Sequence, residues 1–228
     1  MRILVSTLAL LIFVSMIAAA DDAPASKSTP PSKKEDASGK KKDAPLTVGN
    51  ELPGPFHPYN VTGENKQRFH CLVSEHGLEP TVLIFYKNVD FSDPLPALLK
   101  RLDAAIAKNP NTRLGAFAVF LPDDLPDVTG SKEKDDAANN KNDDARLELE
   151  KKVEGFATDM KLKNVVLCLD DKSDVAKYRL DDANLVAVVL YSKLKIVAVH
   201  ALPKSDFTDA TVEKIMAEVA DKLGAKRK

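Results

Sequence analysis

Two cysteines and a group of histidines are the side chains of this chain that are best able to do chemistry. His70 directly precedes Cys71, and His57, His70 and His76 fall within about twenty residues that also contain Cys71. A thiolate beside an imidazolium can attack a disulfide, because the positive charge lowers the pKa of the thiol. Imidazole and thiolate also suit zinc or copper, but this spacing fits no established metal motif. We therefore predict Cys71 as the candidate catalytic residue, with no metal and no cofactor.

The sequence leaves three interpretations of Cys71 open. It is a buried structural thiol, a partner of Cys168 in a disulfide, or a reactive redox thiol. A disulfide is plausible because an exported chain with two cysteines often pairs them. Cys168 itself lies in the apolar run NVVLCL, where a cysteine behaves as a small core residue.

The N-terminus predicts export. Residues 1–20 combine Arg2, a long apolar run and the exit Ala18-Ala19-Ala20, which together are typical of a cleaved signal peptide. An uncleaved membrane anchor is the competing interpretation, because the run approaches the length of a membrane span. Cleavage would leave a periplasmic or extracellular protein without membrane attachment. The sequon Asn60-Val61-Thr62 would matter only in a eukaryotic secretory pathway.

Residues 21–46 are rich in Lys, Asp, Ser and Pro and have almost nothing to bury. Such a segment cannot offset the entropy cost of ordering, so it predicts a disordered linker. The formal net charge of the whole chain is −1, which argues against a nucleic-acid partner. Residues 47–228 are then long enough for one domain with its own core.

The pattern of apolar residues predicts an α/β domain. Short β-type pieces within 54–61 suggest an N-terminal hairpin, and residues 122–144 form a polar loop insertion without apolar period. Two antiparallel strands joined at Ser192-Lys193 precede a C-terminal amphipathic helix. The order predicts a mixed central sheet covered on both faces, a three-layer α/β/α arrangement. The remaining strands are expected at 81–86, 114–121 and 164–169, and the remaining helices at 94–108 and 149–160.

The turn between the strand at 81–86 and the following helix is where thiol oxidoreductases place a reactive cysteine. Backbone N–H groups and the helix dipole favour a thiolate there. In this chain the segment is TVLIFYKNVDFSDPLPALLK, and it contains no cysteine.

Two segments carry a resemblance to a known family. LIFYKNVDFSDPL is similar to the peroxiredoxin segment in which a strand ending in Phe-Tyr is followed by Pro, Asp-Phe-Thr-Pro and the peroxidatic cysteine. LDDKSDVAKYRLDDANLVAVVLYSKLKIVAVHAL is similar to a later portion of that family. Over roughly residues 48–224 the chain thus resembles the thioredoxin-like superfamily. Within it, the chain looks like a divergent secreted peroxiredoxin-like (AhpC/TSA, redoxin) protein.

The resemblance implies a degenerate active site. It puts Leu95 at the place of the peroxidatic cysteine and Ser92 at the hydroxyl that orients the peroxide. It puts Lys87 near the shielding proline, and Asp-Asp-Ala-Asn at 181–184 where the family has its arginine. The signal for the cis-proline of thioredoxin-type reductases is also missing. Leu95 is explained more simply as the first residue of an apolar helix stripe, since leucine supplies no thiolate.

Two functions remain open at this stage. The first is an exported, non-catalytic binding or structural module that meets a protein partner through its sheet edge or its insertion. The alternative is an atypical thiol-disulfide oxidoreductase that uses Cys71, alone or with Cys168. The resemblance to secreted thioredoxin-like proteins that carry a Cys-x-x-Cys pair here implies that Ser74 replaces the second thiol, so that Cys71 could form mixed disulfides but no local one. The sequence names neither the partner nor the oligomeric state.

Overall fold

The computed structural model describes residues 46–123, 125 and 136–224, and within α3 and α4 it leaves the side chains of 136–143, 223 and 224 undescribed. The predicted signal peptide at 1–20 and nearly all of the predicted linker at 21–46 therefore lie outside the described residues. Among the helices that are described, none is both long enough and apolar enough to cross a membrane.

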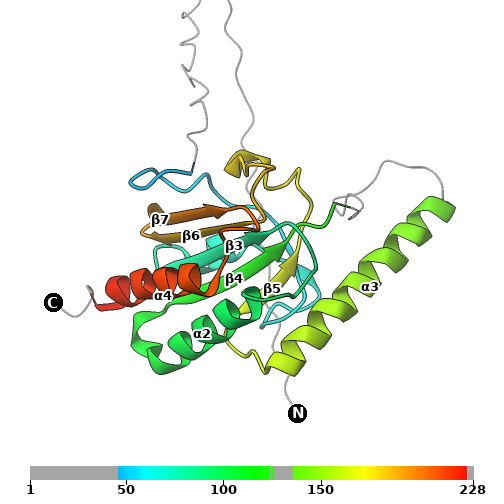
Figure 1. Ribbon diagram of the computed structural model, residues 1–228. Helices are drawn as coiled ribbons and strands as arrows, with labels where there is room; N and C mark the ends of the chain where they lie inside the picture. Colours follow the sequence, from blue (N-terminus) through cyan, green and yellow to red (C-terminus); the bar gives the residue numbers. More distant parts are fainter. Residues whose placement is uncertain (1–45, 124, 126–135, 225–228) are drawn as a thin grey trace, which may run out of the picture. The chain divides into compact units, whose positions relative to one another are not determined.

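A seven-stranded mixed sheet forms the centre of the domain (Figure 1). Its strand order is β2-β1-β5-β4-β3-β6-β7. β3 pairs in parallel with β4, and β4 with β5, whereas β3 pairs antiparallel with β6. The strands are β1 (Tyr59–Asn60), β2 (Arg68–Phe69), β3 (Thr81–Tyr86), β4 (Gly115–Phe120), β5 (Val166–Leu169), β6 (Val186–Ser192) and β7 (Lys195–Leu202). The predicted α/β class and the C-terminal hairpin with its following helix are confirmed.

One face of the sheet is covered by α2 (Leu95–Lys108), α4 (Asp209–Gly224) and the C-terminal part of α3 (Asp136–Met160) (Figure 1). Alternate residues of β3, such as Val82 and Ile84, point into the core under these helices. The intervening residues, such as Leu83 and Phe85, belong to the core on the opposite face. Both sets are buried, as expected for a central strand that is apolar along its whole length.

The second face also carries helices, as the predicted three-layer arrangement requires, but these helices are short. Its only regular helices in the described chain are α1 (Leu72–His76) and the 3-10 turn η2 (Ala176–Tyr178). Phe56, which precedes the first strand, fills the remaining space by packing against Phe85 and Tyr178 at ring distances of 5.6 and 5.4 Å. Large aromatic side chains thus bury this face without a long helix.

The polar insertion is shorter than predicted, because α3 begins at Asp136 and not after residue 144. No apolar period marks residues 136–144, so periodicity alone misses this part of the helix. The physical reason is that extending an existing helix costs far less than starting one, and Ala137, Ala138, Lys141 and Ala145 favour helix.

The N-terminal hairpin is present, but its strands are not within 54–61 alone. β1 at Tyr59–Asn60 pairs antiparallel with β2 at Arg68–Phe69 and, on its other side, with β5. Pro55 and Pro58 explain the later start, because proline cannot donate to a strand ladder.

Gly115, the first residue of β4, lies directly against the ring of His76. A Cβ at this position would come within 2.5 Å of His76 Cε1. We expect Gly115→Ala to lower the free energy of unfolding by about 1–3 kcal/mol, because the half-buried ring of His76 must shift. Urea denaturation followed by circular dichroism measures this loss.

Gly155, exposed within α3, is the matched control. No heavy atom lies within 4 Å of the Cβ that alanine would add there. Gly155→Ala should therefore raise the free energy of unfolding by about 0.5–1 kcal/mol. Equal effects at both glycines would show that His76 does not pack against Gly115 as described.

Candidate functional site

Leu95, which the resemblance aligns with the peroxidatic cysteine, is the first residue of α2 and is fully buried. With Leu98, Leu99 and Leu102 it forms the buried stripe of the helix. The interpretation of Leu95 as a core residue is confirmed. The first residue of α2 therefore packs its isobutyl side chain into the core. Leu95 provides no nucleophile at this position.

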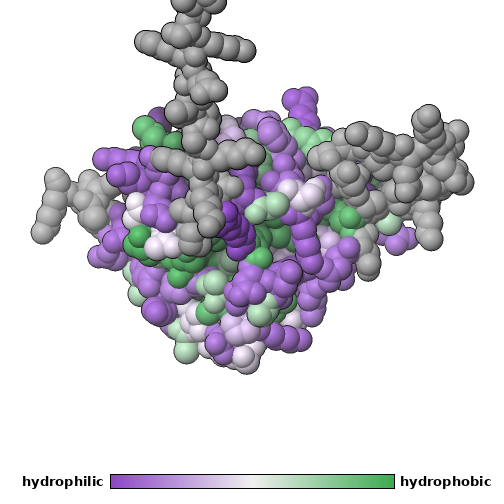
Figure 2. Space-filling view, turned by 90° about the horizontal axis from the view of Figure 1, so that it is seen from above, coloured by the Kyte–Doolittle hydropathy of each residue, from purple (hydrophilic) through white to green (hydrophobic). Residues whose placement is uncertain are grey.

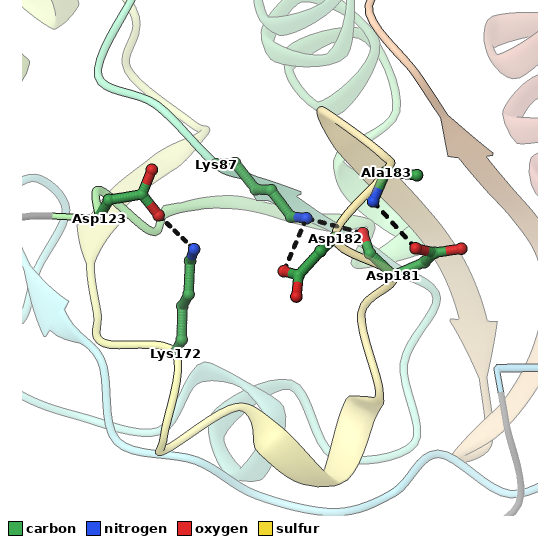
Figure 3. A network of polar contacts seen from close by, with 6 residues as sticks. All are labelled: Lys87, Asp123, Lys172, Asp181, Asp182 and Ala183. Carbon is green, nitrogen blue, oxygen red and sulfur yellow. Dashed lines mark hydrogen bonds and ion pairs between the residues drawn. The ribbon is translucent and has the colours of Figure 1, made fainter.

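Lys87 and the segment 181–184, the two other positions at which the resemblance implied a departure from the family, meet in space (Figure 3). Lys87 directly follows β3, and its Nζ donates hydrogen bonds to Asp181 O at 2.7 Å and to Asp182 Oδ1 at 3.1 Å. The Lys87 side chain is only 17% exposed, whereas that of Asp182 is 92% exposed. A lysine thus fills the space at the carboxyl end of β3 and ties it to the loop before β6.

A second ion pair lies beside the first one. Lys172, in the turn after β5, pairs with Asp123, which follows β4 (Figure 3). Between the two lysines is a hollow of about 210 Å³ whose apolar walls include Leu121 and Val175. Lysines from the ends of β3 and β5 and Asp182 from the loop before β6 thus line one hollow, a juxtaposition that sequence patterns do not reveal.

The hydroxyl at Ser92 serves the local turn. Its Oγ donates to Asp90 Oδ2 at 3.3 Å, and its backbone N–H donates to Asp90 Oδ1 at 3.2 Å. A cis peptide bond joins Asp93 to Pro94 in the same turn. In the loop before β6, position 184 is an asparagine and not a proline. The serine hydroxyl is therefore held by its own turn and faces no thiol there.

Cys71 is the N-cap residue of α1 and not part of an open loop. Its Sγ accepts a hydrogen bond from the backbone N–H of Ser74 at 3.4 Å, and the residue is 8% exposed. Cysteine takes here the capping role that Ser or Asp usually fills. The five-residue helix is too short to leave a periodic signal, so the sequence did not reveal this role.

Two tyrosines lie close to the Cys71 thiol. The Tyr178 hydroxyl donates to Gly54 O at 2.6 Å, and burial raises its pKa. Burial likewise raises the pKa of Tyr191 to about 12, with the Cys71 thiol as a further cause. These phenols therefore remain neutral at ordinary pH and place no charge beside the thiol.

Cys168 is completely buried on β5. Its Sγ donates to Asn60 Oδ1 at 3.2 Å, and burial, together with the charges of Asp170 and Glu75, raises the pKa of the thiol. Both Cys71 and Cys168 are free, so the structure contains no disulfide between them. Because Asn60 is fully buried, its sequon is not accessible in the folded domain.

The histidines do not converge with Cys71 on one centre. His57 is exposed, and His70 Nε2 lies 2.8 Å from Glu75 Oε2. His76 stacks on Phe117, and burial lowers the pKa of its imidazole. The described part of the chain holds no group of three side chains able to bind a metal.

Asp170, which directly follows β5, is a buried carboxyl group. Its Oδ1 accepts from Asp171 N at 2.9 Å, and the residue is 3% exposed. Burial, and then the charge of Asp174, raise the pKa of Asp170 to about 8. Asp174 in turn accepts a hydrogen bond from His57 N at 2.6 Å. Asp174 thus attaches the segment before β1 to the turn after β5.

Comparisons with known proteins give structural matches alone. No protein-family model and no curated protein matches the sequence. A peroxidoxin from Mycobacterium tuberculosis is 15% identical, with 80% of this chain and 99% of that chain covered and a TM-score of 0.49. A yeast mitochondrial 1-Cys peroxiredoxin is 14% identical, with 78% of each chain covered and a TM-score of 0.49. A thiol peroxidase from Chromobacterium violaceum is 15% identical, with 78% and 90% covered and a TM-score of 0.47.

The fold assignment rests on the sheet itself. A parallel β3-α2-β4-α3-β5 unit is extended by the antiparallel strands β6 and β7 and closed by α4, as the resemblance implied. The chain has a thioredoxin-like fold. In this thioredoxin-like domain the start of α2 is buried, and a lysine occupies the adjoining end of β3.

Proposed function

We propose that this protein is a non-catalytic binding module, a divergent secreted member of the peroxiredoxin-like branch that lacks the active-site cysteine. The observation that carries the proposal is the buried Leu95 at the start of α2, with Lys87 bonded to the loop before β6 in place of an open thiol site. Thiol catalysis needs a thiolate that reaches its substrate, and leucine supplies none.

A second candidate function uses Cys71 as a lone redox thiol. The observation in its favour is the hydrogen bond from Ser74 N–H to Cys71 Sγ, because such donors stabilise a thiolate. Against it, Cys71 is buried and its N-cap bond gives the thiol a structural role. We therefore place the binding function first.

The rate of thiol alkylation separates the two functions. We expect iodoacetamide to modify Cys71 in the native protein at least about tenfold more slowly than in urea, because burial restricts access. Cys168→Ser and Cys71→Ser assign each rate to one thiol. Rapid modification of Cys71 in the native protein well below pH 8 would instead favour the redox function.

The proposal includes export of the protein through an N-terminal signal peptide that is cleaved. Cleavage after Ala20 would release a chain that begins at Asp21. Mass spectrometry of the protein recovered after secretion by a host cell should give this N-terminus. A mass that retains residues 1–20 would favour the membrane-anchor interpretation.

A further inference from the structure

The hollow at the carboxyl ends of the strands contains more positive than negative side chains. Its lining includes Lys87, Lys172 and Arg179, against the single carboxylate of Asp182. Ligands of open α/β sheets commonly bind outside the carboxyl ends of the strands. The place and the charge of this hollow both suit an anionic group.

Lys87 has a donor left for such a group. An ammonium group carries three N–H donors, and in the described part of the chain two of them serve Asp181 O and Asp182 Oδ1. Lys87 lines both this hollow and an adjoining one of about 140 Å³. Its mostly buried side chain thus keeps the charge at the junction of the two hollows.

Arg179 is the second cation at this junction, because it also lines both hollows. It ends η2 in a left-handed backbone conformation, with φ 49° and ψ 51°. Its guanidinium makes no ion pair with the residues that the structure describes, whereas Lys87 and Lys172 each have a carboxylate partner. A guanidinium offers parallel N–H donors that match a carboxylate.

The apolar walls of the hollow strengthen the attraction between its cationic side chains and an anionic ligand. Leu121 and Val175 are 1% and 2% exposed and surround the charges with apolar groups. Ion pairs are stronger where water is excluded. Figure 2 shows hydrophilic residues over much of one face, with apolar residues between them.

We propose that this hollow binds an acidic side chain of a partner protein, with Arg179 and Lys87 contacting the carboxylate. The proposal rests on the proposed binding function, for which it supplies the chemistry of the partner. Asp182, which is 92% exposed, competes for Lys87 and can move into solvent when the ligand carboxylate arrives.

An NMR titration of the purified, ¹⁵N-labelled protein at low salt tests the proposal. The probes are acetyl-Gly-Glu-Gly-amide, its Gln counterpart and acetate. We expect saturable shifts at the amides of Lys87, Leu121 and Arg179 with the Glu peptide and none with the Gln peptide. Acetate binding as tightly as the Glu peptide would overturn the assignment to a protein side chain, because the site would then recognise any small carboxylate.

Three variants make the test specific. Arg179→Gln should weaken binding of the Glu peptide about five- to tenfold, and Asp182→Asn should tighten it about threefold or more. Arg113→Gln is the matched control, because Arg113 ends η1 (Pro110–Thr112) in the same left-handed conformation but does not line the hollow. It should leave the affinity unchanged.

Equal affinities for Arg179→Gln and Arg113→Gln, or shifts that do not saturate, would overturn the proposed site. Thermal melting of each variant shows whether the fold is intact. The proposed binding function is tested separately, because rapid alkylation of Cys71 in the native protein would contradict it. A failure of the carboxylate site can therefore be distinguished from a failure of the binding function.

Discussion

Leu95→Ala should destabilise the domain by about 3–5 kcal/mol, a large share of the stability of a typical domain. Leu95 is fully buried at the start of α2, where it packs in the core between the helices and the sheet. Removing most of its side chain leaves a cavity that close-packed neighbours fill only in part. Urea denaturation monitored by circular dichroism measures the loss.

Two further variants keep this prediction testable if Leu95→Ala does not fold. Leu95→Met keeps the volume and should cost less than about 1.5 kcal/mol. Leu78→Ala, at a leucine that is 62% exposed, should change the free energy of unfolding by no more than about 0.5 kcal/mol. A Leu95→Ala variant as stable as Leu78→Ala would mean that Leu95 is not part of the core.

Asp170→Asn should stabilise the domain by about 2 kcal/mol or more at pH 8, and much less at pH 4. In the native state the pKa of Asp170 is raised from 3.8 to about 8, so the unfolded chain loses its proton first. Stability is therefore lost as the pH rises between these values, by about 1.4 kcal/mol per pH unit. Asparagine removes this dependence and keeps an oxygen acceptor for Asp171 N.

Free energies of unfolding between pH 4 and pH 8 measure this effect. Asp159→Asn, at an exposed position on α3, is the control and should keep the slope of the unmodified protein. The same slope in Asp170→Asn would show that another group causes it.

The sequence predicted the central elements well because their patterns are strong. The strand expected at 81–86 matches β3, and the helix expected at 94–108 matches α2 within one residue. A fully apolar strand and a stripe of leucines report burial directly, since each residue must be covered. The role of Leu95 followed from the same stripe.

The candidate site was harder to predict, because it depends on contacts between distant segments. Lys87 and Asp182 were each identified as altered positions, but their hydrogen bond joins residues that lie far apart in the chain. The burial of Asp170 was also missed, since an Asp-Asp pair after a strand usually marks an exposed turn. The capping role of Cys71 could not be predicted, because α1 is too short to show a helical period.

Turnover assays with insulin disulfides and with hydrogen peroxide test the central claim most directly. Each assay compares the unmodified protein, Cys71→Ser and a blank without protein, with a dithiol reductant present throughout. A non-catalytic thioredoxin-like module predicts that both proteins give the rate of the blank, because Leu95 supplies no thiolate and Cys71 is buried. A rate above the blank that Cys71→Ser abolishes would contradict this account.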